Sequence, residues 1–155
     1  MFCEEHVIAI GYALIEVHPS KVPIEALEAE ISKRYPEKKS PSYAAKKLKE
    51  FVSIKRDDTV LICHGYNATQ SNVYVYGLAT VTGSFRKEGF TKKLTWRFKH
   101  DADILRIEKD FPRNELATAL GNKAKSLIGS LHRLDIARLD SFNQMLKKHG
   151  VQVSR

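Results

Sequence analysis

The run VYVYGLATVTG, residues 73–83, indicates the fold more clearly than any other stretch of the chain. Branched and small apolar residues alternate there with tyrosine and threonine, which is the two-residue period of side chains that point to opposite faces of a sheet. Gly77 interrupts the alternation and suggests a β-bulge. The run therefore predicts a strand with one buried face.

Three further runs predict strands on either side of it. TVLIC, residues 59–63, is short and apolar, and a loop rich in turn-forming residues separates it from the central run. TKKLTWRF, residues 91–98, alternates between apolar and polar or basic side chains. VIAIGYALIEV, residues 7–17, is rich in β-forming residues, although Gly11 within it permits a bulge or the close approach of another group. We expect these runs to form one curved, mostly antiparallel sheet.

Two amphipathic helices are predicted between the strand runs at residues 7–17 and 59–63. Apolar residues recur at helical spacing over residues 21–34 and 42–53. The sequence Tyr35-Pro36 ends the first helix, and Ser42 is placed to cap the first turn of the second.

The last third of the chain reads as helical. Predicted helices span residues 111–120, a stretch that carries Leu127, Ile128 and Leu131, and residues 136–149. The last of these ends in basic residues followed by a glycine, which complements the helix dipole. The order of elements indicates an α+β fold with a small curved sheet or barrel. We expect one domain over residues 1–121, with residues 122–155 as a helical extension packed on it.

The charge balance points to a polyanionic partner. Lys+Arg outnumber Asp+Glu by 26 to 18, which gives a net charge of +8 and a pI near 9.5. Such a surplus attracts nucleic acid, although surface lysines alone can also produce it. The charge is concentrated in residues 33–49, with a net +6, and in residues 86–99, with a net +5.

The motifs that would identify an enzyme are missing from the sequence. It contains no GxSxG, no phosphate-binding glycine loop with its lysine and no HExxH. The histidines are scattered, and Cys3 and Cys63 form no paired spacing, so we expect no metal, no cofactor and no catalytic residue. The N-terminus lacks a basic region before its apolar run, and no apolar stretch approaches the roughly 18 residues of a membrane span. We expect a cytoplasmic protein without a membrane partner.

Aromatic residues gather in the same region as the second group of cations. Seven of them fall between positions 66 and 98. Bases stack on such rings at roughly 1–3 kcal/mol each, while neighbouring cations hold phosphates. We expect Phe98 and one strand tyrosine to be core residues, whereas Tyr66, Phe85 and Trp96 fit either a core or a binding site.

Five segments in order resemble the EVE-like branch of the PUA-like superfamily, and each is weak when taken alone. They cover most of residues 7–121. The segments are IAIGYALIEV (8–17), AAKKLKEFVSIKRDDTVLIC (44–63), YVYGLATVTGSF (74–85), KKLTWRF (92–98) and FPRNELATALG (111–121). The five segments resemble the N-terminal DNA-recognition modules of McrB-type and Mrr-like restriction proteins, and they resemble YTH readers of RNA more distantly.

The resemblance implies a PUA-like barrel whose cleft takes one flipped-out, often methylated base. It further implies a specificity module of a modification-dependent restriction system, in which other domains or subunits cut the DNA. Tyr12 and Trp96 match the family pattern. Ser42 and Tyr43 are chosen because a helix N-terminus next to the sheet could line a cleft, and His64 and Asn67 because they could hydrogen-bond a base edge from the loop. The base-pocket candidates are Tyr12, Ser42, Tyr43, His64, Tyr66, Asn67, Phe85 and Trp96. The phosphate-contact candidates are Lys46, Lys47, Arg86, Lys87, Lys92, Lys93 and Arg97.

Three alternatives stay open from the sequence. The first is an RNA-binding PUA- or YTH-like module. The second is a small enzyme that acts on nucleic acid. The third is a protein-interaction domain of a larger assembly, in which Leu127, Leu131, Leu139 and Phe142 would form an exposed apolar stripe rather than core.

Overall fold

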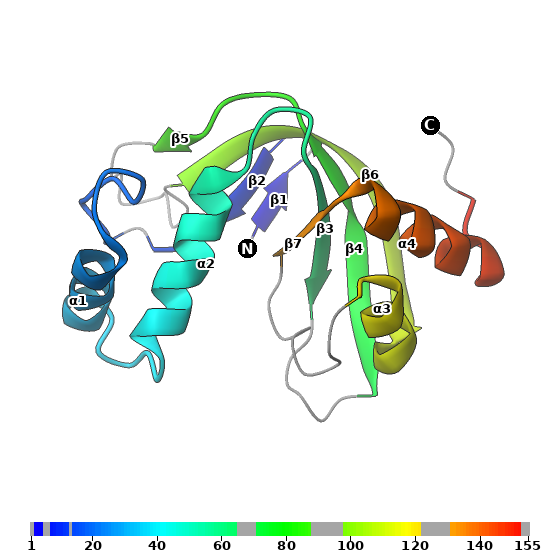
Figure 1. Ribbon diagram of the computed structural model, residues 1–155, viewed down its shortest axis with the longest axis horizontal. Helices are drawn as coiled ribbons and strands as arrows, with labels where there is room; N and C mark the ends of the chain where they lie inside the picture. Colours follow the sequence, from blue (N-terminus) through cyan, green and yellow to red (C-terminus); the bar gives the residue numbers. More distant parts are fainter. Residues whose placement is uncertain are drawn as a thin grey trace. The chain divides into compact units, whose positions relative to one another are not determined.

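The computed structural model describes residues 2–4, 7–12, 14–64, 71–87, 98–121 and 131–152. The chain divides into two compact units, whose elements are labelled in Figure 1. Unit 1 comprises residues 1–56 and 82–101, and unit 2 comprises residues 57–81 and 102–155. One long strand, β6 (Phe98–Pro112), contributes its first residues to unit 1 and the remainder to unit 2.

Unit 1 combines short antiparallel strands with two helices. Strand β1 (Phe2–Glu4) pairs with β2 (Val7–Ile10), and β2 pairs with the start of β6, as does β5 (Arg86–Lys87). Helices α1 (Ile24–Arg34) and α2 (Pro41–Ser53) lie against each other, as Figure 1 shows. The core of this unit contains the following buried side chains: Ile8, Ile15, Leu27, Ile31, Leu48, Phe51 and Phe98.

The two predicted helices of unit 1 are confirmed, with small shifts at their ends. The cap of α2 was predicted at the wrong serine. The Oγ of Ser40 accepts a hydrogen bond from the Tyr43 N–H at 3.4 Å, and Pro41 opens the helix. Proline is favoured at this first position because its fixed φ suits the helix and its missing N–H would have no partner there. Ser42 therefore lies inside the first turn rather than at the cap.

The first predicted strand is shorter than expected. Strand β2 ends at Ile10, and residues 11–17 were wrongly included in it. Tyr12 has a φ of +100°, and the Ile15 N–H donates to the Tyr12 carbonyl at 3.1 Å. This turn stops the strand, so Gly11 marks its end rather than a bulge within it.

Unit 2 contains a four-stranded antiparallel sheet. Its strands are β3 (Thr59–His64), β4 (Asn72–Val81), the second part of β6 and β7 (Leu131–Leu134), in the order β6-β4-β3-β7. The pairing of β4 with β6 shifts register between Val75 and Gly77, which confirms the predicted bulge. A Cβ at Gly77 would lie 2.3 Å from the Leu105 carbonyl oxygen, so only glycine permits this approach.

Two helices pack on the unit 2 core, α3 (Arg113–Ala119) and α4 (Ile136–Lys148). They confirm the first and third predicted C-terminal helices. At the end of α4 the Val151 N–H donates to the Leu146 carbonyl at 2.9 Å and the Gly150 N–H to the Lys147 carbonyl at 3.0 Å. With Gly150 at a φ of +71°, this is a Schellman motif, which explains why the helix stops at the predicted glycine.

One expectation for the C-terminal third was wrong, and one alternative is not supported. Leu131 was placed in a helix but begins β7, because residues 131–134 pair with β3. Residues 122–130 lie outside the described part. The exposed stripe is also not found where it can be checked, since Phe142 is 0% exposed and Leu139 packs against the core.

The described strands confirm an α+β fold with an antiparallel sheet. Hydrogen-bonded neighbours follow the order β1-β2-β6-β4-β3-β7, with β5 off this path. In the residues that the structure describes, the order has two ends, so the sheet is open and the expected barrel closure is not seen.

Candidate nucleic-acid interface

The basic surplus lies mainly in unit 1. Lys+Arg outnumber Asp+Glu by 16 to 10 in the residues of unit 1 and by 10 to 8 in those of unit 2. Unit 1 thus carries +6 of the net charge of +8. A polyanion is attracted most strongly to the unit with the larger charge, so the candidate interface is sought there.

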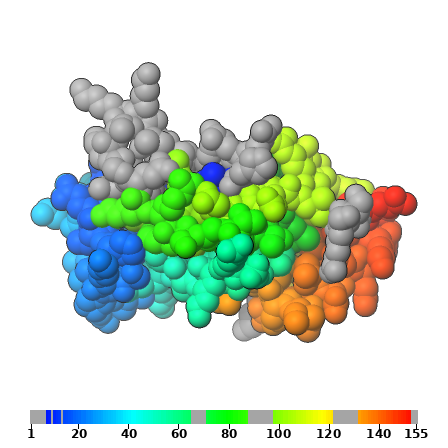
Figure 2. Space-filling model, turned by 90° about the horizontal axis from the view of Figure 1, so that it is seen from above, coloured from blue at the N-terminus to red at the C-terminus, as the bar shows by residue number. Residues whose placement is uncertain are grey.

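Three tyrosines from separate parts of unit 1 form a group that we call the tyrosine cluster: Tyr12, Tyr35 and Tyr43. The rings of Tyr12 and Tyr35 meet edge to face, with centroids 5.6 Å apart and planes at 87°. The Tyr35 hydroxyl accepts a hydrogen bond from the Leu14 N–H at 2.9 Å. This bond and the ring contact fix the end of α1 against the turn that follows β2. Figure 2 shows the chain of α1, in blue, at the surface of unit 1.

An unusual backbone conformation presents Tyr12 to the cluster. A φ of +100° is rare for a bulky residue, and such conformations cost of order 1–3 kcal/mol. They persist only where the surroundings enforce them, and they gather at functional sites. Here the contact with Tyr35 and the hydrogen bond from the Ile15 N–H hold the conformation.

A lysine lies over the ring of Tyr12. The sequence Tyr35-Pro36-Glu37-Lys38 forms a turn in which the Lys38 N–H donates to the Tyr35 carbonyl at 3.0 Å. Proline suits the second position of such a turn because its φ is fixed near the required value. The turn brings the Lys38 ammonium to 5.7 Å from the centroid of the Tyr12 ring, within cation–π range.

A second lysine lies over the ring of Tyr43. Lys47 follows Tyr43 by four residues on α2, so the two side chains share one helix face. The Lys47 ammonium is 5.8 Å from the centroid of the Tyr43 ring and 2.7 Å from a carboxylate oxygen of Glu50. Because Tyr43 is 47% exposed, its ring and this cation are accessible to a ligand.

Burial raises the pKa of Tyr12, and the nearby phenols of Tyr35 and Tyr43 raise it further. Tyr43 carries the second lysine–ring contact of the tyrosine cluster. The Tyr12 phenol is neutral at physiological pH, as an ordinary phenol is, so it carries no charge that would repel a phosphate.

Other base-pocket candidates lie elsewhere. Ser42 is half-buried in the first turn of α2. Phe85 stacks on Phe98, with centroids 5.9 Å apart and planes at 15°, and meets the His18 ring edge to face at 5.2 Å. His64 is an exposed residue at the end of β3 in unit 2. Tyr66, Asn67 and Trp96 lie outside the described residues.

The phosphate-contact candidates differ in their exposure and in the partners that their side chains already have. Lys46 is exposed on α2. Arg86 is held by Asp101 at 2.5 Å, and the Lys87 ammonium donates to the Glu16 carbonyl. An acidic partner weakens the attraction of a cation for phosphate, so Lys46 is better suited than Arg86. Lys92, Lys93 and Arg97 lie outside the described residues.

The sequence reasoning missed Tyr35 and Lys38 as site residues. Tyr35 was interpreted only as the end of a helix, and Lys38 only as part of a basic stretch. The Tyr-Pro turn beside a lysine is the one local signal that could have indicated them.

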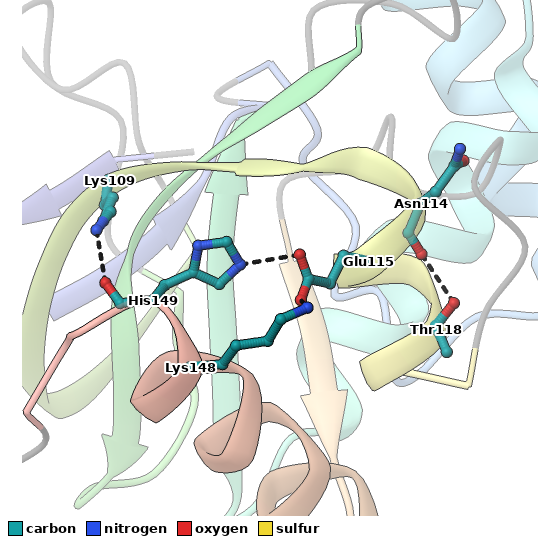
Figure 3. Close-up of polar contacts among 6 residues, drawn as sticks. All are labelled: Lys109, Asn114, Glu115, Thr118, Lys148 and His149. Carbon is teal, nitrogen blue, oxygen red and sulfur yellow. Dashed lines mark hydrogen bonds and ion pairs between the residues drawn. The ribbon is translucent and has the colours of Figure 1, made fainter.

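Two polar features of unit 2 are formed by residues that were not predicted as site residues. An open depression of about 840 Å³ is lined by Asp57–Thr59 and Arg133–Leu139. Glu115 on α3 accepts a hydrogen bond from Lys148 at 2.6 Å and pairs with the His149 Nε2 at 2.9 Å, as Figure 3 shows. These hydrogen bonds from Lys148 and then His149 lower the pKa of Glu115. The Glu115 contacts join α3 to the end of α4.

The described part of the chain shows neither a metal-binding group nor a membrane-spanning helix. It holds no group of three or more His, Cys, Asp or Glu residues arranged to bind a metal ion. No helix there is long and apolar enough to span a membrane. No family model, curated protein or solved structure matches this chain, so its own residues must indicate what it binds.

Proposed function

We propose that this chain is a nucleic-acid-binding module and that the tyrosine cluster, with the lysines of α2 and the preceding turn, is its contact surface. One observation carries the proposal. In the more basic of the two units, the rings of Tyr12 and Tyr35 are in contact, and an ammonium group lies over the ring of Tyr12 and another over the ring of Tyr43.

The chemistry of nucleic acid matches these groups. Lysines bind phosphates and release counterions, which supplies affinity without sequence preference. Aromatic rings stack with bases, which supplies a contact that phosphates alone cannot provide. The exposed Lys46 and the partly exposed Lys47, one helix turn from Tyr43, allow both kinds of contact on one helix face.

The more specific part of the proposal rests on the five segments that resemble EVE-like domains. On that basis the chain is a cytoplasmic PUA-like module, with residues 1–121 as the binding domain and residues 122–155 as its extension. It recognises a modified, methylated base in DNA by base flipping, and it chooses the DNA for a restriction system whose other parts carry the catalysis. RNA is the second candidate ligand, because PUA and YTH relatives read RNA.

A binding panel tests both levels. Labelled oligonucleotides carry N6-methyladenine, 5-methylcytosine, 5-hydroxymethylcytosine or no modification, as DNA and as RNA, and affinity is measured over a series of salt concentrations. We expect salt-dependent binding, tighter for one modified DNA. Equal affinity for all modifications would remove the modified-base claim but leave nucleic-acid binding.

A matched pair of lysine variants tests the surface. Lys46→Ala should weaken binding to every sequence by a similar factor and lower the salt slope by roughly one unit. Lys147→Ala, an exposed lysine on α4 in unit 2, is the control and should leave the slope unchanged. If both variants behave like the parent, the proposed contact surface is wrong.

A further inference from the structure

We infer that the tyrosine cluster binds unpaired nucleotides by an exchange: a base replaces the lysine on a tyrosine ring, and the released ammonium moves to the backbone phosphate. This inference rests on the proposed function and names the form of nucleic acid that the site takes.

Two lysines occupy ring faces in the structure, and they do so for different reasons. Lys38 is positioned by the turn that begins at Tyr35, and Lys47 by its spacing of four residues from Tyr43 on α2. The same arrangement of a cation on a phenol ring thus arises twice in one cluster. Each ring face that a base would need is covered by a cation that a phosphate would attract.

The exchange is favourable because base stacking and an ammonium–phosphate contact replace one cation–π contact. A cation–π contact at an exposed site is weaker than the stacking of a base on an aromatic ring. The displaced ammonium gains a phosphate partner and releases a counterion. One nucleotide therefore gives each group a new partner: its base stacks on the tyrosine ring, and its phosphate binds the displaced ammonium.

Only an unpaired base can complete this exchange at low cost. In a duplex both faces of a base are covered by its neighbours, and a base must be unstacked before a ring can reach it. In a single strand the base faces are available, and stacking is tolerant of sequence because every base has a π-face. A duplex can reach the lysines through its phosphates but leaves the ring faces unused.

The two positions differ because Lys47 has an acidic partner. The carboxylate of Glu50 lies 2.7 Å from the Lys47 ammonium and opposes its transfer to a phosphate. Among the residues that the structure describes, no acid pairs with Lys38, whose ammonium contacts the Tyr12 ring. Glu50→Gln should therefore tighten single-strand binding by roughly two- to fivefold, the range of an exposed ion pair.

The test compares oligo(dT) with the oligo(dA)·oligo(dT) duplex on the full chain. Tyr43→Leu removes the ring but keeps an apolar side chain, and Tyr43→Phe keeps the ring. Tyr43 is chosen because it is 47% exposed, so these changes spare the core. We expect Tyr43→Leu to lose about 5- to 100-fold in affinity for oligo(dT) with little change for the duplex, and Tyr43→Phe to retain it.

A second readout follows the lysines directly. In the free protein, ring currents should shift the side-chain methylene protons of Lys38 and Lys47, and titration with oligo(dT) should move these signals back toward their usual positions. The signals are assigned from spectra of Lys38→Gln and Lys47→Gln. Unmoved signals during saturable binding would overturn the exchange.

The outcomes separate this inference from the proposed function. If no oligonucleotide binds, the proposed function fails and the inference fails with it. Nucleic acid could instead bind with the expected salt dependence while Tyr43→Leu lowers the affinity for single strand and duplex by the same factor, or lowers neither. In that case only the inference is overturned.

Discussion

The His149 Nε2 lies 2.9 Å from a carboxylate oxygen of Glu115, and this pair joins the end of α4 to the first turn of α3. Lys148 donates to the other carboxylate oxygen, and the His149 ring also meets the Phe111 ring edge to face at 5.2 Å. The carbonyl of His149 accepts a hydrogen bond from Lys109 at 2.9 Å. Figure 3 shows Lys109, Glu115, Lys148 and His149 at the end of α4.

Acid should weaken this junction. Because the folded pKa of Glu115 is lowered, its contribution to the free energy of unfolding is fully present above the ordinary glutamate pKa and is lost as pH falls through the lowered value. Unfolding measured from neutral pH down to about pH 2, well below the ordinary glutamate pKa, should show this loss in the parent chain, and Glu115→Gln should show a smaller one. Identical pH dependence in the two proteins would contradict the assignment.

Two glycines should respond differently to alanine. Gly77→Ala places a Cβ against the Leu105 backbone and should cost about 3 kcal/mol of unfolding free energy, because the clash is with backbone rather than with a flexible side chain. Gly150→Ala meets nothing within 4 Å and should cost only the positive φ, about 1 kcal/mol. Urea denaturation of both variants checks the order, which would be reversed if the close approach of β4 and β6 were absent.

Two serines near the start of α2 distinguish the observed cap from the predicted one. Ser40→Ala should cost about 1 kcal/mol, because the Tyr43 N–H loses its acceptor. Ser42→Ala should stay within about 0.5 kcal/mol, since alanine suits a helical position. Chemical denaturation measures both, and a larger effect at Ser42 would restore the sequence-based cap.

Two apolar residues of α4 distinguish core from surface. Phe142→Ala should cost about 3–5 kcal/mol, because the side chain is fully buried. Ile136→Ala should be nearly neutral, since that side chain is 81% exposed. Equal destabilisation by the two changes, measured as a fall in Tm, would contradict the observed orientation of the helix.

The elements that could be predicted from sequence are those that local pattern specifies. The alternation of β4 and its glycine bulge depend on neighbours within the strand, and the amphipathic spacing of α1, α2 and α4 is equally local. Strand β7 could not be predicted in this way. Four residues, LHRL, carry too little periodicity to distinguish strand from helix, and the pairing with β3 decides the outcome.

The candidate site was predictable only in part, for the same reason. Tyr12, Tyr43 and Lys47 were named, but the ring contact of Tyr12 with Tyr35 joins residues 23 positions apart and depends on how the chain returns after α1. The positive φ of Tyr12 has no signal in a run that reads as a strand. The residue types therefore indicated aromatic and cationic contacts with nucleic acid, and the tertiary structure determines which of these residues contact one another.

Each of the two compact units is assembled from separated lengths of chain, and β6 belongs to both. Neither unit can therefore be expressed alone as one continuous segment of the chain. A recombination breakpoint placed anywhere between residues 57 and 101 would divide both units. The two halves of this molecule should consequently be inherited together, whatever larger protein or assembly carries them.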